Sequence, residues 1–160
     1  MPTLFLLCGL PGAGKTTLAK QLERDRSALR LAPDEWIVAL LADATDTAER
    51  DRLRDPVEAI QWQVARRALV LGVDVVLEWG FWSRAERERY RSEATALGAR
   101  VELRYLAATR DELWARLARR NEQLPPGTFA VTEAQLDLWS GWFELPNADE
   151  LKSFDDERGG

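Results

Sequence analysis

Short apolar runs alternate with longer amphipathic stretches along this chain. Residues 3–8 form a continuous apolar run that stops at a glycine, which predicts a buried strand. Residues 73–77 are rich in β-branched side chains and residues 100–107 alternate between polar and apolar, so two further strands are predicted, with a short one at 28–31. Helices are predicted at residues 15–24, 33–42, 55–71, 83–97, 109–121 and 132–142. Because strands separated by helices form right-handed βαβ units, we expect a parallel sheet with helices on both faces.

Capping residues mark several helix ends. Three helices begin with a capping box, in which Ser or Thr precedes Glu or Gln by three residues: Ser83 and Glu86, Thr109 and Glu112, Thr132 and Gln135. Asp55 followed by Pro56 predicts a helix start, so residues 43–54 are expected to be loop or frayed helix. The chain becomes polar after Pro146, and the tail Gly159-Gly160 is expected to fray.

The composition is that of a soluble globular domain. The chain has 160 residues, of which 46% are hydrophobic and 31% charged, so we expect residues 1–160 to form a single domain. The sequence has no run of 18 apolar residues, and its apolar N-terminus lacks a basic leader and a cleavage site. One cysteine and no histidine argue against an internal disulfide and a zinc site. A cytoplasmic protein is therefore expected.

The net charge of −5 limits the class of partner. Extended binding to a nucleic-acid backbone requires a basic surface, because neutralisation of phosphates supplies most of that affinity. We therefore expect no extended nucleic-acid footprint, although a few arginines would suffice to hold one phosphorylated or nucleotide-like molecule.

One segment carries a specific nucleotide-binding motif. Gly9-Leu10-Pro11-Gly12-Ala13-Gly14-Lys15-Thr16 has the spacing of a P-loop and lies between a predicted strand and a predicted helix. Glycines allow the backbone to wrap a phosphate so that consecutive N–H groups point inward, and the helix N-terminus adds its positive dipole. In such loops the lysine reaches the β- and γ-phosphates, and the threonine hydroxyl ligates Mg²⁺. We predict that ATP binds to Gly9, Pro11, Gly12, Ala13, Gly14, Lys15, Thr16 and Thr17.

A P-loop by itself does not name the reaction, since switches, motors and carriers also use it. The chain lacks the Asn-Lys-x-Asp motif with which GTPases read their base. It is also too short for the additional small domain of motor and AAA+ assemblies. A small kinase is the class that these absences favour.

Two carboxylates are candidates for the phosphoryl-transfer site, because each follows or ends a predicted strand. Asp34 lies at the start of a helix beyond the second strand, where open α/β sheets place their active sites. It would accept the proton of a substrate hydroxyl, or it would simply cap that helix. Glu78 ends the third strand and would hold a Mg²⁺-bound water or the P-loop threonine; the next residues, 79–82, form an aromatic turn that would line an acceptor pocket or cover the core.

Two arginines are candidates for charge stabilisation around the transferred phosphate. Arg116 and Arg120 are four residues apart on a predicted helix and therefore share a face. Facing a nucleotide, their guanidinium groups would neutralise charge in the transition state. The other interpretation is a solvated face paired with Asp111 and Glu112.

These residues together resemble a group of small P-loop kinases, often labelled AAA-type ATP-binding proteins. The chain looks similar to the kinase domain of polynucleotide kinase and to chloramphenicol phosphotransferase over residues 3–121, through the P-loop, Asp34, Glu78, Arg87 and the arginine pair. The resemblance implies an adenylate-kinase-like, three-layer αβα fold with a parallel sheet of about five strands. It also implies that Asp34 is the general base, and that Arg116 and Arg120 belong to a lid-like segment over ATP, at about 116–131.

The hypothesis from sequence is an ATP-dependent phosphotransferase. It would move the γ-phosphate of Mg·ATP onto a hydroxyl of a small-molecule acceptor, with Lys15, Asp34, Arg116 and Arg120 as catalytic residues and Thr16 and Glu78 at the metal. A 5′-hydroxyl polynucleotide or nucleoside kinase and a non-catalytic nucleotide-binding switch are the alternatives. A cationic acceptor is a further possibility, since an acidic pocket would suit it.

Overall fold

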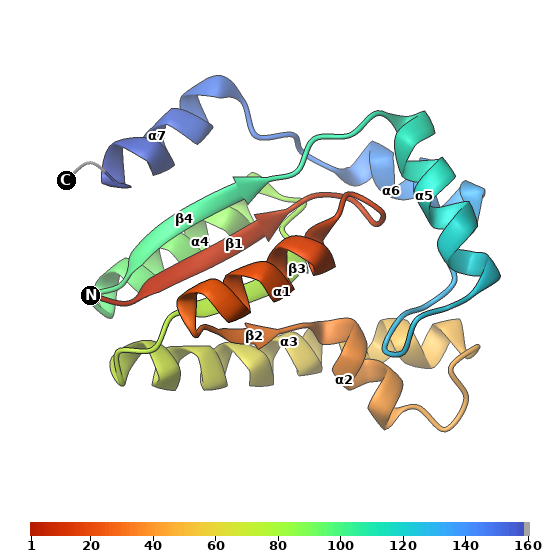
Figure 1. Ribbon diagram of the computed structural model, residues 1–160, viewed down its shortest axis with the longest axis horizontal. Helices are drawn as coiled ribbons and strands as arrows, with labels where there is room; N and C mark the ends of the chain where they lie inside the picture. The colour runs from red at the N-terminus through yellow and green to blue at the C-terminus, as the bar shows by residue number, and fades with distance from the viewer. Residues whose placement is uncertain (159–160) are drawn as a thin grey trace.

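A four-stranded parallel sheet forms the centre of the protein (Figure 1). The computed structural model describes residues 1–158, with side chains through residue 154. The strands lie in the order β2-β3-β1-β4. Their bounds are β1 Thr3–Cys8, β2 Leu29–Leu31, β3 Val75–Gly80 and β4 Arg100–Tyr105. The helices are α1 Lys15–Arg26, α2 Pro33–Leu40, α3 Thr47–Val70, α4 Arg84–Ala96, α5 Arg110–Glu122, α6 Glu133–Trp142 and α7 Ala148–Arg158.

Strand β1 is buried because both of its faces are covered. Phe5 and Leu7 pack with side chains of α1 on one face of the sheet. Leu4 and Leu6 belong to the larger core on the other face, which α3, α4 and α7 complete. Successive residues of a strand point to opposite faces, so a strand between two helical layers must be apolar throughout. The predicted three-layer α/β fold is confirmed, and it brings the carboxyl ends of the strands together at one edge.

The sheet of residues 1–158 has four strands, one fewer than the number of about five implied by the resemblance. After β4 the chain forms α5, a loop that contains Pro125 and Pro126, and then α6 and α7. Proline has no N–H group to donate to a sheet, and the final segment packs as a helix against β4 instead.

Helix α3 begins nine residues before the predicted start at residue 56, so the prediction of a helix start at Asp55 and Pro56 is wrong. The Asp46 carboxylate caps the helix by accepting a hydrogen bond from the Glu49 N–H at 3.0 Å. Pro56 lies inside the helix. An internal proline normally costs about 3 kcal/mol. Burial of the apolar face of α3 against the sheet, including Trp62, compensates for this local penalty.

Helix α7 was not expected in the polar segment that follows Pro146. The buried residues Glu150 and Phe154 attach it to the rest of the domain. Glu150 forms an ion pair with Arg87 of α4 at 2.7 Å, and both side chains are almost completely buried. Arg87, part of the family resemblance, therefore holds the C-terminal helix rather than a nucleotide. The predicted fraying of Gly159-Gly160 lies outside the described residues.

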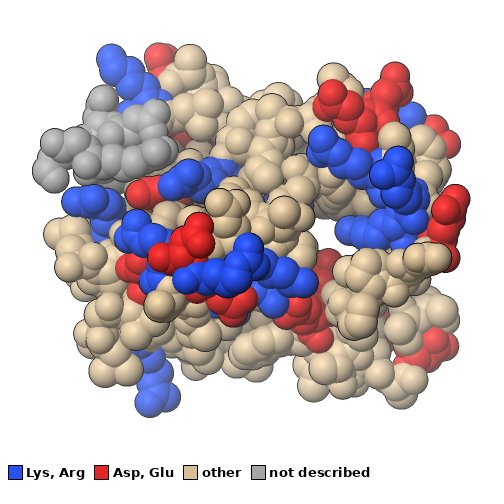
Figure 2. Space-filling model, viewed as in Figure 1, with Lys and Arg blue, Asp and Glu red and all other residues tan. Residues whose placement is uncertain are grey.

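Charge is mixed over the face drawn in Figure 2, where basic and acidic side chains alternate instead of forming one basic surface. Among the helices of residues 1–158, none is long and apolar enough to cross a membrane.

Candidate active site

The P-loop connects β1 to α1 with glycines in conformations that other residues rarely adopt. Gly12 and Gly14 have φ angles of +86° and +98°. A Cβ atom at Gly12 would lie 3.0 Å from the Leu117 side chain, so the loop packs tightly on α5. Gly14 immediately precedes the N-terminus of α1. This backbone has the form needed to wrap a phosphate group with its N–H groups.

Lys15 folds back over this loop. Its Nζ donates hydrogen bonds to the carbonyl oxygens of Gly9 and Leu10, both at 2.9 Å. Burial lowers the pKa of Lys15 to about 8, and the carboxylates of Asp34 and Glu78 partly oppose this effect. Lys15 is therefore close enough to both sequence-predicted carboxylates to interact with them electrostatically.

Glu78 connects the P-loop to strand β2. The Thr16 hydroxyl donates a hydrogen bond to Glu78 Oε1. The other carboxylate oxygen accepts a hydrogen bond from Arg30 at 3.1 Å, and Arg30 also holds Glu35 at 3.0 Å. A hydroxyl and a carboxylate are oxygen donors, the ligand type that Mg²⁺ prefers. The donor set at Thr16 and Glu78 therefore fits this cation.

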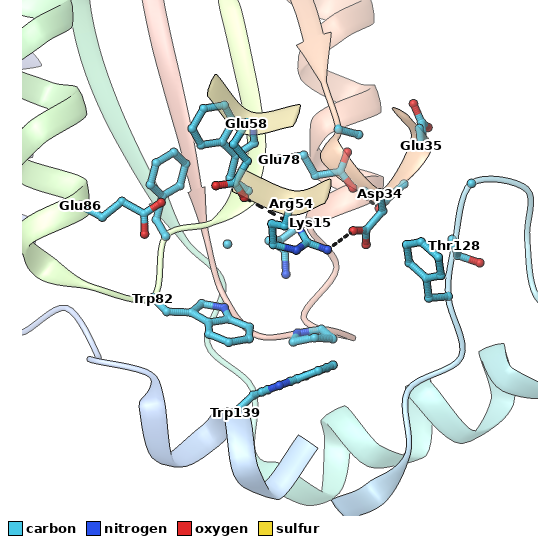
Figure 3. A pocket seen from close by; sticks show the side chains of 18 of the residues that line it. Lys15, Asp34, Glu35, Arg54, Glu58, Glu78, Trp82, Glu86, Thr128 and Trp139 are labelled. Atoms are coloured by element: carbon cyan, nitrogen blue, oxygen red, sulfur yellow. Dashed lines mark hydrogen bonds and ion pairs between the residues drawn. The ribbon is translucent and has the colours of Figure 1, made fainter. Parts of the chain in front are cut away.

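Asp34 lies in the first turn of α2 and points into the cavity. The N-cap residue of α2 is Ala32, which has no side-chain capping hydrogen bond, so Asp34 does not serve as the helix cap. Its carboxylate accepts a hydrogen bond from Arg54 of α3 at 2.5 Å and remains half exposed. The neighbouring Glu35 points away from this pair (Figure 3).

Both sequence-predicted arginines face the P-loop side of the cavity. Arg116 donates a hydrogen bond to the Gly12 carbonyl oxygen at 3.2 Å. Arg120 donates one to the Phe129 carbonyl oxygen at 3.2 Å, while its Nε–H is buried without a partner among the described atoms. Burial lowers the pKa of Arg120, and the charge of Asp34 opposes the shift. Arg116 is exposed, as the interpretation of a solvated face expected, whereas Arg120 is partly buried. Within residues 1–154 neither arginine pairs with Asp111 or Glu112.

One cavity of about 1630 Å³ lies at the carboxyl edge of the sheet (Figure 3). Its lining includes the groups that the sequence singled out and Arg54: Lys15, Thr16, Asp34, Arg54, Glu78, Arg116 and Arg120. Small-molecule sites typically measure about 300–1,000 Å³, so this cavity has room for a nucleotide and a second ligand. The loop at residues 125–129 also lines this cavity. At Gly127 this loop approaches α2 so closely that an added Cβ would lie 2.8 Å from the Glu35 side chain.

The family model of an AAA domain matches residues 4–146, which include β1, the P-loop and every element that lines the cavity. The chain belongs to this family. As an AAA domain it is a P-loop nucleotide-binding protein, and the resemblance inferred from sequence is confirmed. No curated protein matches the chain.

Solved structures share the fold of this AAA domain. A kinase candidate from Chloroflexus aurantiacus J-10-fl has a TM-score of 0.71 and 24% identity, covering 86% of this chain and 74% of that one. A gluconokinase from Sinorhizobium meliloti 1021 has a TM-score of 0.62 and 18% identity, and the match covers 92% of this chain and 78% of the gluconokinase chain. Chaetomium thermophilum Kti12, solved with ADP-AlF3, has a TM-score of 0.63 and 17% identity, and the match covers 98% of this chain and 97% of the Kti12 chain. At these identities the likeness establishes the fold alone.

Arg54 and Glu58 are among the residues of the AAA domain's cavity that were not predicted from the sequence. Both are on α3, one turn apart, and Arg54 lies in a stretch predicted to be loop or frayed helix. The four-residue spacing of Arg54 and Glu58 would have indicated a shared helix face, but only if the helix had been predicted to begin at residue 47. The contact of Arg54 with Asp34 depends on how α3 packs against α2.

Proposed function

We propose that this AAA domain is a kinase that transfers the γ-phosphate of Mg·ATP to a hydroxyl of a small-molecule acceptor. The observation that carries the proposal is the juxtaposition of Asp34 with Lys15 in one cavity large enough for two ligands. A phosphoryl-transfer enzyme needs a group for the acceptor proton on one side of the phosphate and positive charge on the other. A nucleotide-binding switch would have no use for Asp34.

Asp34 is the proposed general base. The acceptor oxygen forms its bond to the γ-phosphorus as the bond from phosphorus to the leaving ADP oxygen breaks, and the acceptor proton passes to an Asp34 carboxylate oxygen. Arg54 holds that carboxylate at 2.5 Å, which fixes its orientation. Lys15, Arg116 and Arg120 surround the transferred group with positive charge.

Thr16 and Glu78 are the residues proposed to hold Mg²⁺. When bound, the cation neutralises charge on the phosphate oxygens. The Thr16 hydroxyl is oriented by the hydrogen bond that it donates to Glu78, and Arg30 holds the other oxygen of the Glu78 carboxylate. Mutation of Arg30 would therefore disturb Thr16 indirectly.

Residues 116–131 are proposed as a lid over the nucleotide. Support comes from Arg116, Arg120 and the loop at 125–129, which all line the cavity. Closure of such a segment would exclude water and favour transfer to the acceptor over hydrolysis.

The test is transfer of labelled γ-phosphate from Mg·ATP to a panel of acceptors. The panel contains sugars, nucleosides, amino alcohols, chloramphenicol-like alcohols and a 5′-hydroxyl oligonucleotide. We expect Asp34→Asn to lower kcat by about 10²–10⁴, the usual contribution of a general base, with ATP affinity nearly unchanged. Lys15→Ala is expected to weaken ATP binding. Asp111→Asn is the matched control, because it makes the same change at an exposed carboxylate of α5 that does not line the cavity.

Full activity of Asp34→Asn would refute Asp34 as the base. Tight ATP binding through Lys15, without transfer to any acceptor and without slow hydrolysis that depends on Asp34, would support the switch. Selective labelling of the oligonucleotide would identify a polynucleotide kinase instead of a small-molecule kinase.

A further inference from the structure

The end of the cavity away from the P-loop has its own chemistry. Near the P-loop the lining is basic, with Lys15, Lys20, Arg116 and Arg120. At the far end, helices α3 and α4 form the walls. Their lining side chains include the carboxylates Glu58, Glu86 and Glu93 and several aromatic rings, together with Arg66 and Arg89. A second substrate would bind there, since the phosphate end belongs to the nucleotide.

Glu58 and Glu86 are the carboxylates of this far end. Both side chains point into the same space in Figure 3. Helix α3 leads into β3 and helix α4 leads out of it, so both run away from the carboxyl edge of the sheet. Trp62 and Tyr90 lie four residues further along their helices, with ring centroids 4.9 Å apart. Glu58 and Glu86 therefore face each other one turn above this aromatic contact.

Neither carboxylate has a close cationic partner among the described residues. Arg54 reaches Glu58 only at 3.8 Å, because its shorter contact is with Asp34. The side chains near Glu86 are also engaged elsewhere: Arg89 with Glu93 at 3.0 Å, and Arg87 with buried Glu150. No hydrogen bond or ion pair to the Glu86 carboxylate is formed within residues 1–154.

The electrostatics of the pair agree with this geometry. The pKa of Glu58 is raised to about 7, chiefly by burial; the nearby charges of Glu86, Asp55 and Asp34 contribute to this rise, and Arg54 opposes it. Burial likewise raises the pKa of Glu86. Two partly buried carboxylates that share only one distant ion pair, from Arg54 to Glu58, are costly, and a bound cation would reduce that cost.

The aromatic floor behind the pair favours the same kind of ligand. Trp79 stacks on Phe81 at 5.7 Å, and the Tyr90 ring meets both of them edge-on. Aromatic faces attract cations through their quadrupole and also provide apolar contact for a carbon skeleton.

We propose that the acceptor is an amino alcohol, whose ammonium group lies between Glu58 and Glu86 and whose carbon skeleton lies over the aromatic floor. This inference rests on the proposed kinase function and specifies its substrate class. The hydroxyl to be phosphorylated would then point from the amine site toward Asp34, which lines the same cavity.

The test compares amines with their N-acetylated forms, which keep every hydroxyl but lose the charge. The probes are 2-amino-1-phenylethanol, D-glucosamine and 2-deoxystreptamine. We expect kcat/KM for phosphate transfer to at least one amine to exceed that for its acetylated form by more than tenfold. Glu58→Gln and Glu86→Gln should each reduce this preference about tenfold, the loss expected for one charge-assisted hydrogen bond. Glu88→Gln is the matched control, since it removes the same charge from an exposed position on α4.

A second readout separates this proposal from the kinase proposal. Binding of each probe is followed by tryptophan fluorescence in the presence of Mg·ADP, and unfolding midpoints establish that each variant is folded. Amine binding that weakens in Glu58→Gln and Glu86→Gln supports the amine site even if no phosphate is transferred, in which case only the kinase reaction is rejected. Equal use or binding of amine and acetylated forms, preference for an anionic acceptor, or failure of all amines to bind at millimolar concentration overturns the amine site.

Discussion

Replacement of Glu58 by glutamine should make the protein more stable, although it should impair the acceptor site. The side chain of Glu58 is 17% exposed, and burial raises its pKa from 4.5 to about 7. The native state therefore retains this proton up to about pH 7, whereas the unfolded chain releases it near pH 4.5. The unfolded state binds fewer protons in this window, so wild-type stability falls as the pH rises through it.

The pKa shift sets the size of the effect. Each pKa unit corresponds to about 1.4 kcal/mol, so keeping the carboxylate charged above pH 7 costs about 3 kcal/mol. A glutamine amide also loses hydration in this site, which we take to cancel about half of the gain. We therefore expect Glu58→Gln to raise the free energy of unfolding by about 1–2 kcal/mol at pH 8, and by less than half of that at pH 5. For a chain of this length the melting temperature should rise by about 3–6 °C at pH 8.

The assay is thermal unfolding of wild type, Glu58→Gln and the control Glu88→Gln at pH 5 and pH 8. Comparison with wild type at each pH removes the contributions of all other titrating groups. A stability gain that is equal at the two pH values, or larger at pH 5, would refute the reasoning. A gain of the same size in Glu88→Gln would show that it comes from net charge instead of the buried carboxylate.

Three further predictions concern the P-loop and the buried ion pair. Burial lowers the pKa of Lys15 to about 8, so ATP affinity should fall as the pH rises through 8 and the ammonium group loses its proton. Isothermal titration at pH 7 and pH 9 should show a smaller fall in affinity for Lys15→Arg, because a guanidinium group keeps its charge. Arg87→Met should lower the free energy of unfolding by about 3–5 kcal/mol in urea denaturation, because it leaves the Glu150 carboxylate buried without a counterion, and the added change Glu150→Leu should recover most of the loss. Gly12→Ala should weaken ATP binding at least about tenfold, since the strain of a positive φ angle, about 1–2 kcal/mol, adds to a contact of 3.0 Å with α5. Gly98→Ala has nearly the same φ angle in open space, so it should cost stability without changing ATP affinity.

The nucleotide site was predictable because its determinants are local. A strand, a glycine loop and a helix start are encoded in consecutive residues, from Thr3 to Thr17, and each depends on intrinsic backbone preferences. The alternating order of strands and helices predicts a parallel sheet whose strands end at one edge. Asp34 and Glu78 were predicted to lie at the site because each stands at the carboxyl end of a strand. Helix α3 was mispredicted because Asp55 and Pro56 form a strong local start signal that tertiary packing overrides.

The far end of the cavity was not predictable, because it depends on contacts between segments that are distant in sequence. Asp34 and Arg54 are 20 residues apart, and their ion pair depends on the packing of α2 against α3. Glu58 and Glu86 face each other only because α3 and α4 descend side by side from the same edge of the sheet. The amino-acid sequence by itself determined that this protein folds around a P-loop and binds a nucleotide, since those features are short-range. Only the tertiary structure decided what surrounds the second ligand, since helix packing selects which charged side chains line the cavity.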